Sequence, residues 1–198
     1  LLYASSFANR HIDTFPVLDY DAQDISFPKG DDPLKRHTLM ICCCALFCAL
    51  IIVSTLLFRF TIPGTDVMVT LQVFFVLLCG QLLTPKYCLY TIGAYLFAGL
   101  IGLPVFSAVS GLSVVATPSF GYLIAFPAAV AVCSFVRIRT NEKKGSRYLA
   151  SLCGIAVMYG IALLYILLLS RLLMNDAFSI GQLTTGYLLI FLPLDLLK

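Results

Sequence analysis

The feature that most limits how this chain can fold is the length of its uncharged stretches. Residues 38–58, 67–85, 87–136, 148–170 and 177–194 contain no Asp, Glu, Lys or Arg. About 20 consecutive apolar residues are enough to cross a bilayer as an α-helix, so four of these stretches each fit one membrane span. Of the 198 residues, 60% are hydrophobic and 12% are charged, whereas soluble domains have roughly 45–50% and about 25%. The sequence therefore predicts an all-α integral membrane protein.

The stretch 87–136 is too long for one helix. Glycine, proline and serine residues interrupt it between positions 99 and 121, which favours two spans joined by an irregular segment at 104–119. The full prediction is six transmembrane helices, at 38–58, 69–84, 87–103, 120–136, 148–170 and from about Pro193 onward. Because the chain lacks an initial Met and stops soon after Pro193, we expect both ends, and the last helix, to be truncated.

Lysine and arginine residues collect on one side of these spans, as they do in cytoplasmic loops. That side carries Arg10, Lys29, Lys35, Arg36, Lys86, Arg137, Arg139, Lys143, Lys144 and Arg147, and the other carries Arg59 and Arg171. We therefore expect a multi-pass protein of the cell membrane with a cytoplasmic N-terminus, and with 104–119 and 171–192 outside. Residues 1–37 are polar, acidic and interrupted by prolines, which predicts a mostly disordered cytoplasmic arm.

Several classes of function are disfavoured by the residues available. The eight cysteines lie in or at apolar spans without a C-x2-C pair, and the only histidines are His11 and His37; we therefore expect apolar cysteines and no metal site. The chain has no Walker loop and no G-x-S-x-G elbow, which disfavours an ATPase or a hydrolase. The basic stretch 137–147 lies between two spans, so we interpret it as a topogenic loop and not as a nucleic-acid site.

Two charged residues, Asp195 and Lys198, fall within the predicted last span. A charge at the centre of a membrane helix costs at least about 2.5–3.5 kcal/mol on insertion scales. Pro193 is well suited to the first helical position, which places Asp195 in the first turn and Lys198 three residues on, along the same face. The pair is either a mutual ion pair at the membrane edge or a site for a ligand with amide-like N–H groups and a carboxylate.

Other polar or small residues occur at the ends of the predicted spans. Thr70-Leu71-Gln72 opens the second span, and the outer segment from Gly102 to Tyr122 contains hydroxyls, aromatic rings and free backbone N–H groups. Irregular backbone at membrane depth needs cover from protein or a watery cavity, so this segment forms either a pocket wall or an ordinary loop. In the first span, Ala45 and Ala49 form a small-xxx-small pair that permits close helix approach.

Taken in order, these motifs resemble the BioY family, the biotin-binding S components of energy-coupling-factor (ECF) transporters. The likeness covers residues 38–198. It rests on Ala45-x-x-x-Ala49, Thr70-Leu71-Gln72, Leu83-Thr84-Pro85-Lys86, Gly99-Leu100-Ile101-Gly102-Leu103-Pro104-Val105-Phe106, Ser110-Gly111, Pro118, Gly121-Tyr122 and Pro193-Leu194-Asp195-Leu196-Leu197-Lys198.

The resemblance implies a six-helix membrane subunit that captures biotin outside the cell and releases it inside. Biotin is then a transported ligand, and neither a cofactor nor catalytic turnover is implied. Energy comes from partners, namely the transmembrane coupling protein EcfT and a pair of cytoplasmic ABC ATPases, in agreement with the missing Walker loop. In this family the Ala-x-x-x-Ala face docks EcfT, which gives that role to Ala45 and Ala49.

The family pattern also carries over to individual positions. Its ligand-binding positions match Gln72, Ser110, Gly111, Tyr122, Asp195 and Lys198. Asp195 is expected to accept from the ureido N–H groups of biotin, and Lys198 to bind its carboxylate. Tyr122 and Phe106 are expected to pack against the thiophane ring and the aliphatic chain.

The sequence departs from the family pattern at the outer segment. Ala108-Val109 stand where members usually have a glycine pair, and Phe120 replaces a glycine. Leu123 stands where some members have an arginine, which leaves more of the carboxylate binding to Lys198. Two alternatives stay open: an S component for another small carboxylated vitamin or precursor, and an integral membrane enzyme or chaperone that acts on lipid.

Overall fold

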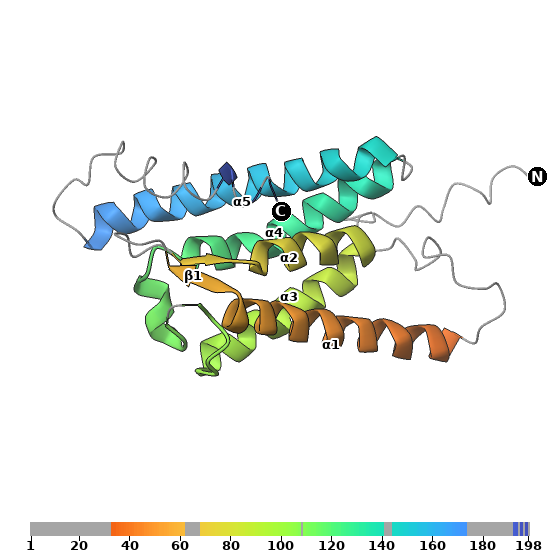
Figure 1. Cartoon of the computed structure of the whole chain (residues 1–198), viewed down its shortest axis with the longest axis horizontal. Coiled ribbons are helices and arrows are strands. Elements are labelled where there is room, and N and C mark those ends of the chain that lie inside the picture. Colours follow the sequence, from red (N-terminus) through yellow and green to blue (C-terminus); the bar gives the residue numbers. More distant parts are fainter. Residues whose placement is uncertain are drawn as a thin grey trace, which may run out of the picture.

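Helices make up most of the part of the chain that the structure describes. The computed structural model describes residues 33–61, 68–107, 109–140 and 144–173, together with Leu192, Pro193, Asp195 and Leu197. The elements in this part are α1 (Pro33–Leu57), β1 (Arg59–Thr61), β2 (Met68–Thr70), α2 (Gln72–Leu82), α3 (Pro85–Ile101), the 3₁₀ helix η2 (Leu112–Ala116), α4 (Phe120–Arg139) and α5 (Lys144–Leu173) (Figure 1). The predicted helical architecture is confirmed, and the predicted irregular segment lies between α3 and α4, where it holds only η2.

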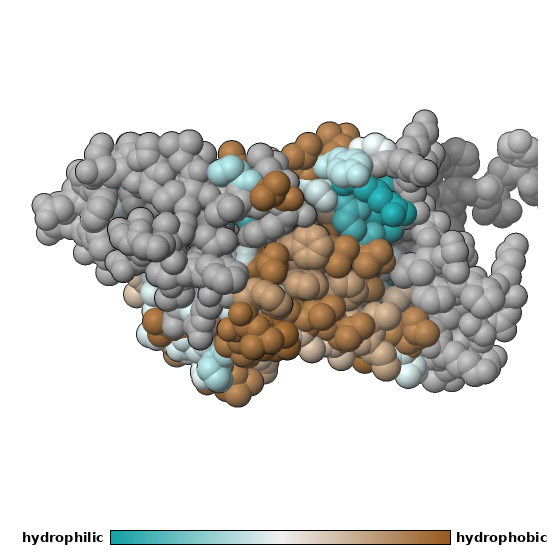
Figure 2. Space-filling model, in the orientation of Figure 1, coloured by the Kyte–Doolittle hydropathy of each residue, from teal (hydrophilic) through white to brown (hydrophobic). Residues whose placement is uncertain are grey.

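Three of the helices are long and apolar enough to cross a membrane. They are His37–Leu57, Phe120–Arg139 and Gly145–Arg171. Large apolar side chains point outward from the bundle, among them Leu46 of α1 and Leu164 of α5, and Figure 2 shows a broad hydrophobic surface on the side of α1. An apolar exterior of this size suits lipid and not water, so the chain is a multi-pass membrane protein.

Helix α2 is shorter than the predicted span 69–84. It has 11 residues, from Gln72 to Leu82, because the residues before it form strand β2, which pairs antiparallel with β1. At its other end Pro85 follows Thr84 and starts α3, and the residue before a proline disfavours helical backbone. At about 1.5 Å per residue, the helical part of this span is shorter than the predicted bounds, so those bounds were wrong, and the crossing of the membrane at this position stays a prediction.

Helix α1 begins earlier than the predicted span 38–58. Its first residue is Pro33, which suits a first helical position because its fixed φ is already helical and its missing N–H is not needed there. The helix therefore starts before the predicted span, while the part of it that is long and apolar enough to cross a membrane begins at His37. Residues 1–32 of the predicted arm lie outside the described residues.

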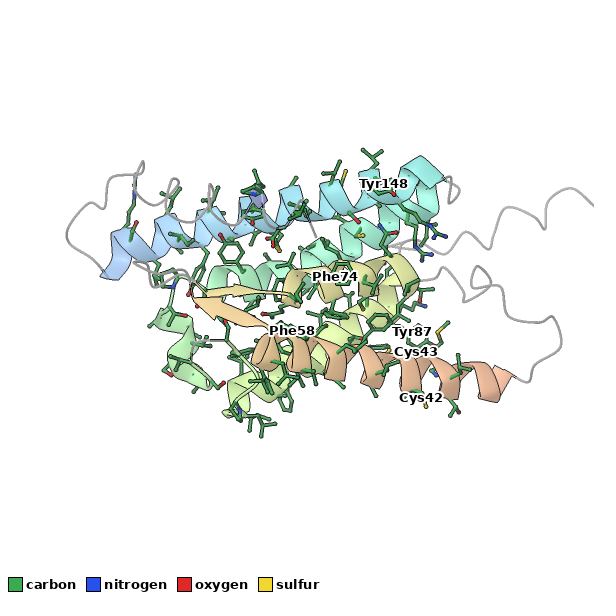
Figure 3. The ribbon with its side chains drawn as sticks, in the orientation of Figure 1. Cys42, Cys43, Phe58, Phe74, Tyr87 and Tyr148 are labelled. Carbon is green, nitrogen blue, oxygen red and sulfur yellow. The ribbon has the colours of Figure 1, made fainter. Side chains whose placement is uncertain are left out.

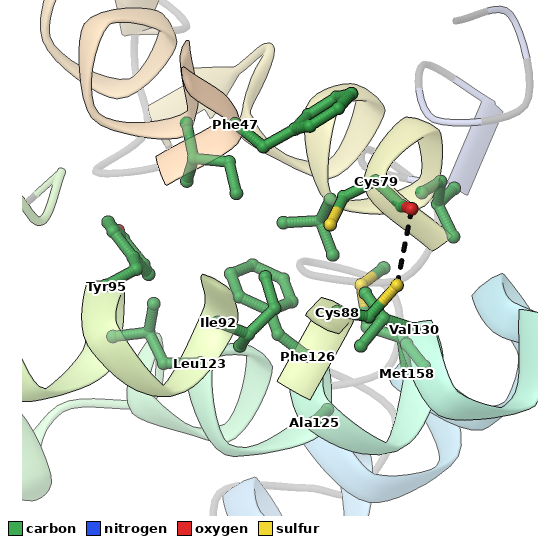
Figure 4. Packing of buried hydrophobic residues seen from close by; sticks show 14 of the residues in the cluster. Phe47, Cys79, Cys88, Ile92, Tyr95, Leu123, Ala125, Phe126, Val130 and Met158 are labelled. Carbon is green, nitrogen blue, oxygen red and sulfur yellow. Dashed lines mark hydrogen bonds between the residues drawn. The ribbon is translucent and has the colours of Figure 1, made fainter. Parts of the chain in front are cut away.

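The helices pack in layers that depend on close backbone approach. Helix α4 lies along α5, while α1 lies beside α3 (Figure 1). A Cβ at Gly121 of α4 would lie 3.0 Å from the Ala162 carbonyl oxygen, and one at Gly154 of α5 would lie 3.2 Å from that of Ala129. Small residues therefore allow α4 and α5 to touch. Figure 4 shows the apolar core between the helices, to which α3, α4 and α5 contribute Ile92, Tyr95, Leu123, Phe126 and Met158.

Side chains of α4 hold the carboxyl end of α2. The Ser134 hydroxyl donates to the carbonyl oxygens of Gly80 at 2.7 Å and Leu83 at 3.2 Å, and the Arg137 guanidinium donates to Leu83 at 3.3 Å. Only 4% of Arg137 is exposed. The sequence predicts a topogenic loop from residue 137, whereas α4 in the structure extends to Arg139. The carbonyl group at the end of α2 gives the Arg137 cation a buried partner there.

Replacement of Arg137 by Met is expected to destabilise the protein by about 1–3 kcal/mol, because the Leu83 carbonyl loses a charged donor inside the bundle. Thermal unfolding in detergent measures this change. Arg139→Met is the matched control, since Arg139 is exposed and lies over the Phe135 ring at 5.2 Å. An equal shift in both variants would contradict a capping role for Arg137.

The cysteines are free thiols in the structure. Cys79, Cys88 and Cys133 are buried in the apolar core, whereas Cys42 is exposed on α1 and points away from the bundle in Figure 3. The Cys88 thiol donates to the Cys79 carbonyl oxygen at 3.3 Å (Figure 4). Within the described ranges, no three His, Cys, Asp or Glu side chains are placed to hold a metal ion.

Candidate functional site

The first polar group inside the bundle lies where α2 begins. Gln72 is the first residue of α2 and is only 5% exposed. Its Nε2 donates to the Tyr95 hydroxyl of α3 at 2.8 Å. That hydroxyl donates in turn to the Val105 carbonyl oxygen at 3.3 Å, so a chain of hydrogen bonds links α2, α3 and the segment after α3.

The direction of this chain fixes the orientation of the Gln72 amide. The Val105 carbonyl can only accept, so the single hydroxyl proton of Tyr95 is directed to it. The Tyr95 oxygen is then left to accept, and only the NH₂ side of the Gln72 amide can donate to it. The amide oxygen of Gln72 is therefore the side of the group that does not face the Tyr95 hydroxyl.

The segment after α3 folds back onto the last turn of that helix. The Phe106 ring is buried and packs edge to face against Tyr95, with centroids 5.4 Å apart. It lies directly over Gly99, where any Cβ would overlap the ring. The Gly111 N–H donates to the Gly99 carbonyl at 2.8 Å, and Gly111 has a φ of 85°, which favours glycine. Phe106 and Gly111 are therefore brought together over Gly99.

The rest of this segment is attached to α5. The Tyr165 hydroxyl donates to the Val115 carbonyl of η2, and the Tyr165 ring packs edge to face against Phe120 at 5.8 Å. Ser110 is partly buried, and its carbonyl accepts from the Ser113 hydroxyl at 3.4 Å. These contacts fix the segment against α3 and α5, and both predicted alternatives, a pocket wall and an ordinary loop, are compatible with them.

The second polar group lies between α4, α5 and the last described residues. Asp195 is 6% exposed, and its Oδ2 accepts from the Tyr159 hydroxyl of α5 at 2.7 Å. The Tyr159 ring packs edge to face against Tyr122 of α4, with centroids 5.7 Å apart. Near Asp195 in the chain, Leu192 packs against the apolar core. The carboxylate is thus held inside the bundle.

The structure brings most of the predicted site residues into one apolar cluster. Phe106 belongs to its buried residues and Tyr122 packs against it. Gln72 and Asp195 hydrogen-bond to two buried members of the cluster, Tyr95 and Tyr159. Ser110 is partly buried but is not a member of this cluster, and Lys198 lies outside the described residues. Both the ion pair and the cation site predicted for Lys198 therefore stay predictions.

The two predicted docking residues lie away from this cluster. Ala45 and Ala49 are exposed on α1, whereas Phe47 and Ile51 of the same helix are buried. Ala45 and Ala49 are one turn apart and share a face. This face of α1 is therefore not used for packing by the part of the chain that the structure describes.

Sequence reasoning missed the tyrosines that organise both polar groups. Tyr95 is fully buried and Tyr159 is 4% exposed. A buried tyrosine hydroxyl nearly always has a hydrogen-bond partner, so a tyrosine in the middle of an apolar span is a usable signal. The role of Gly99 was also missed: its lack of a side chain makes room for the Phe106 ring.

The fold and the site define a polytopic helical membrane protein that keeps an amide and a carboxylate inside an apolar bundle. The same fold occurs in the crystal structure of the S-component for biotin from an ECF-type ABC transporter. The two share 24% sequence identity and superpose with a TM-score of 0.70 over 84% of this chain and 88% of that one. Identity this low establishes the fold alone.

Sequence comparison places the chain in a family. The BioY family model matches residues 29–198, and the chain belongs to the BioY family, as the motifs predicted. A probable biotin transporter BioY from Pyrococcus horikoshii is 38% identical over 141 residues, which cover 70% of this chain and 80% of that protein. One from Lysinibacillus sphaericus is 33% identical over 133 residues, covering 67% of this chain and 66% of that protein.

Proposed function

We propose that this protein is the substrate-binding membrane subunit of a biotin uptake system. The observation that carries the proposal is Asp195, a carboxylate 6% exposed among apolar helices and held by a tyrosine. A buried carboxylate is costly in a membrane unless it has a function or partners. Biotin offers a suitable ligand, because its ureido ring has two N–H donors. Relatives of this chain carry the name biotin transporter.

In this proposal, each site residue binds a different part of biotin. Asp195 accepts hydrogen bonds from the ureido N–H groups. The remaining hydrogen bonds to the ureido ring come from Ser110, from the Gly111 backbone or from Gln72, whose amide both donates and accepts. Phe106 and Tyr122 pack against the thiophane ring and the aliphatic chain. Lys198 binds the valerate carboxylate as a cation.

The wider architecture follows the family. The proposed subunit has six transmembrane helices, the last of which contains Asp195. It lies in the plasma membrane with its N-terminus in the cytoplasm, because the basic residues collect on that side. Biotin enters from the outside, where the segment between α3 and α4 covers the bundle.

As the family resemblance implies, energy for uptake comes from EcfT and a pair of ABC ATPases, in agreement with the lack of a Walker loop in this sequence. The proposed docking face for EcfT is the exposed side of α1 at Ala45 and Ala49. Two small residues one turn apart let a partner helix approach the α1 backbone closely. This face needs no rearrangement of the described helices to become accessible.

Equilibrium binding of radiolabelled biotin to the purified full-length protein in detergent tests the proposal. We expect saturable, stoichiometric binding that unlabelled biotin displaces. Failure to bind biotin, together with binding of another small carboxylated vitamin, would show that the site recognises that vitamin and not biotin. Turnover of lipid by the same preparation without vitamin binding would support the membrane enzyme instead.

Replacement of Gly99 by Ala is expected to weaken biotin binding by about tenfold, because the new Cβ displaces the Phe106 ring from its place against Tyr95. Gly93→Ala is the matched control on the same helix, since a Cβ there meets nothing within 4 Å. Binding isotherms for the two variants provide the comparison. Parent-like affinity in Gly99→Ala would remove Phe106 from the site.

A further inference from the structure

The hydrogen bond between Tyr159 and Asp195 has the geometry of a strong contact. The hydroxyl oxygen lies 2.7 Å from Oδ2, which is the distance at which an O–H group donates to a carboxylate oxygen in a charge-assisted bond. The donor is the phenol, because an ionised carboxylate can only accept. Both residues are at least nine-tenths buried, with exposed fractions of 4% and 6%, so water competes little for either group.

Tyr159 itself is rigidly held. It lies in the middle of α5, which runs from Lys144 to Leu173, and its neighbours Met158 and Ala162 are completely buried. Its ring stands edge to face on Tyr122 at an interplanar angle of 88°. The hydroxyl oxygen therefore has a position set by the bundle, whereas Asp195 comes from a separate segment at the end of the described chain.

We infer that Tyr159 is a positioning residue for ligand recognition, whose hydroxyl orients the Asp195 carboxylate toward the N–H groups of the bound ligand. The inference rests on the proposed function and adds a residue to that site. A carboxylate has about four lone-pair sites, so the bond from Tyr159 does not by itself prevent the Asp195 carboxylate from accepting hydrogen bonds from a ligand. A carboxylate oriented before binding loses less conformational freedom when the ligand arrives.

A double-mutant cycle separates this role from simple packing. The four proteins are the parent, Tyr159→Phe, Asp195→Ala and the double variant, each assayed for equilibrium binding of biotin. Phe keeps the ring against Tyr122 and removes only the hydroxyl. Ala removes the acceptor, so the hydrogen bond from Tyr159 to residue 195 is absent in that background. Tyr148→Phe is the control on the same helix, because Tyr148 is exposed and points outward (Figure 3).

The expected result is a loss in affinity for biotin of about tenfold in Tyr159→Phe, as for a hydrogen bond to a charged group. In the Asp195→Ala background the same change is expected to have less than about a twofold effect, since the hydroxyl then has no acceptor at residue 195 through which to act. Parent-like affinity in Tyr159→Phe overturns the inference. An equal loss in both backgrounds also overturns it, because the hydroxyl would then act without Asp195.

Two further outcomes are distinguishable. If the parent does not bind biotin, the proposed function fails and the inference falls with it, whereas parent binding with no effect of Tyr159→Phe removes the inference alone. If Tyr159→Phe does not fold because the buried carboxylate has lost its donor, the double variant with Asp195→Ala is measured instead, since it lacks the carboxylate charge. Equal affinity of the double variant and Asp195→Ala then supports the inference, and weaker binding by the double variant contradicts it.

Discussion

Replacement of Asp195 by Ala is expected to lower the affinity for biotin by about thirtyfold or more, equivalent to about 2 kcal/mol. The variant removes the one buried carboxylate that the described part of the bundle contains. The ureido N–H groups then lose their charged acceptor in a site from which water is largely excluded, and a broken charged contact in such a place costs most. Isothermal titration of the purified variant measures the loss.

The same change is expected to have only a small effect on the stability of the protein without ligand. Asp195→Ala removes a buried charge and leaves the Tyr159 hydroxyl without its acceptor, so the two contributions to stability oppose each other. We therefore expect a small change in thermal unfolding beside a large change in binding. Parent-like affinity for biotin would show that Asp195 has only a structural role.

Replacement of Ala45 by Trp is expected to abolish biotin uptake in cells that contain the ECF partners, while binding by the purified subunit stays within about twofold of the parent. Ala45 is exposed on α1, away from Gln72 and Asp195. An indole on this face separates α1 from a partner helix by more than a small-residue contact tolerates. Uptake of radiolabelled biotin and binding to the purified protein are the two measurements.

The matched variant for this experiment is Ala156→Trp. Ala156 is exposed on α5, so the same substitution places the same side chain on another outward face. We expect uptake in this variant to remain near that of the parent. Loss of binding and uptake together in Ala45→Trp would mean that the Ala45 face packs within the subunit.

The helices were largely predictable because charge and hydropathy decide what enters a bilayer. The prediction of a span at 120–136 lies within α4, and that at 148–170 lies within α5. The break after α3 was also predictable, since Gly102 adopts a φ of 109° that ends a helix. The helix ends were less accurate, because Pro33 and Arg139 belong to helices whose charged ends extend beyond the apolar stretch.

The contacts that complete the site could not be predicted in the same way. Tyr95 and Gln72 are 23 residues apart, and Tyr159 and Asp195 are 36 residues apart. Each pair joins different segments, so it depends on how the helices pack and not on a local pattern. The hairpin of β1 and β2 is short, and its residues lack a strong strand pattern. The buried position of Arg137 was not predicted for a related reason, because only the tertiary structure shows that it binds the Leu83 carbonyl.

The central claim is that a buried carboxylate is retained in this bundle because biotin satisfies it. A structure of the full-length protein with bound biotin tests this most directly. The account predicts a ureido nitrogen about 2.7–3.0 Å from an Asp195 carboxylate oxygen, with the Tyr159 hydroxyl still bound to Oδ2. A biotin molecule bound elsewhere, with the Asp195 carboxylate in contact with protein groups alone, would contradict it.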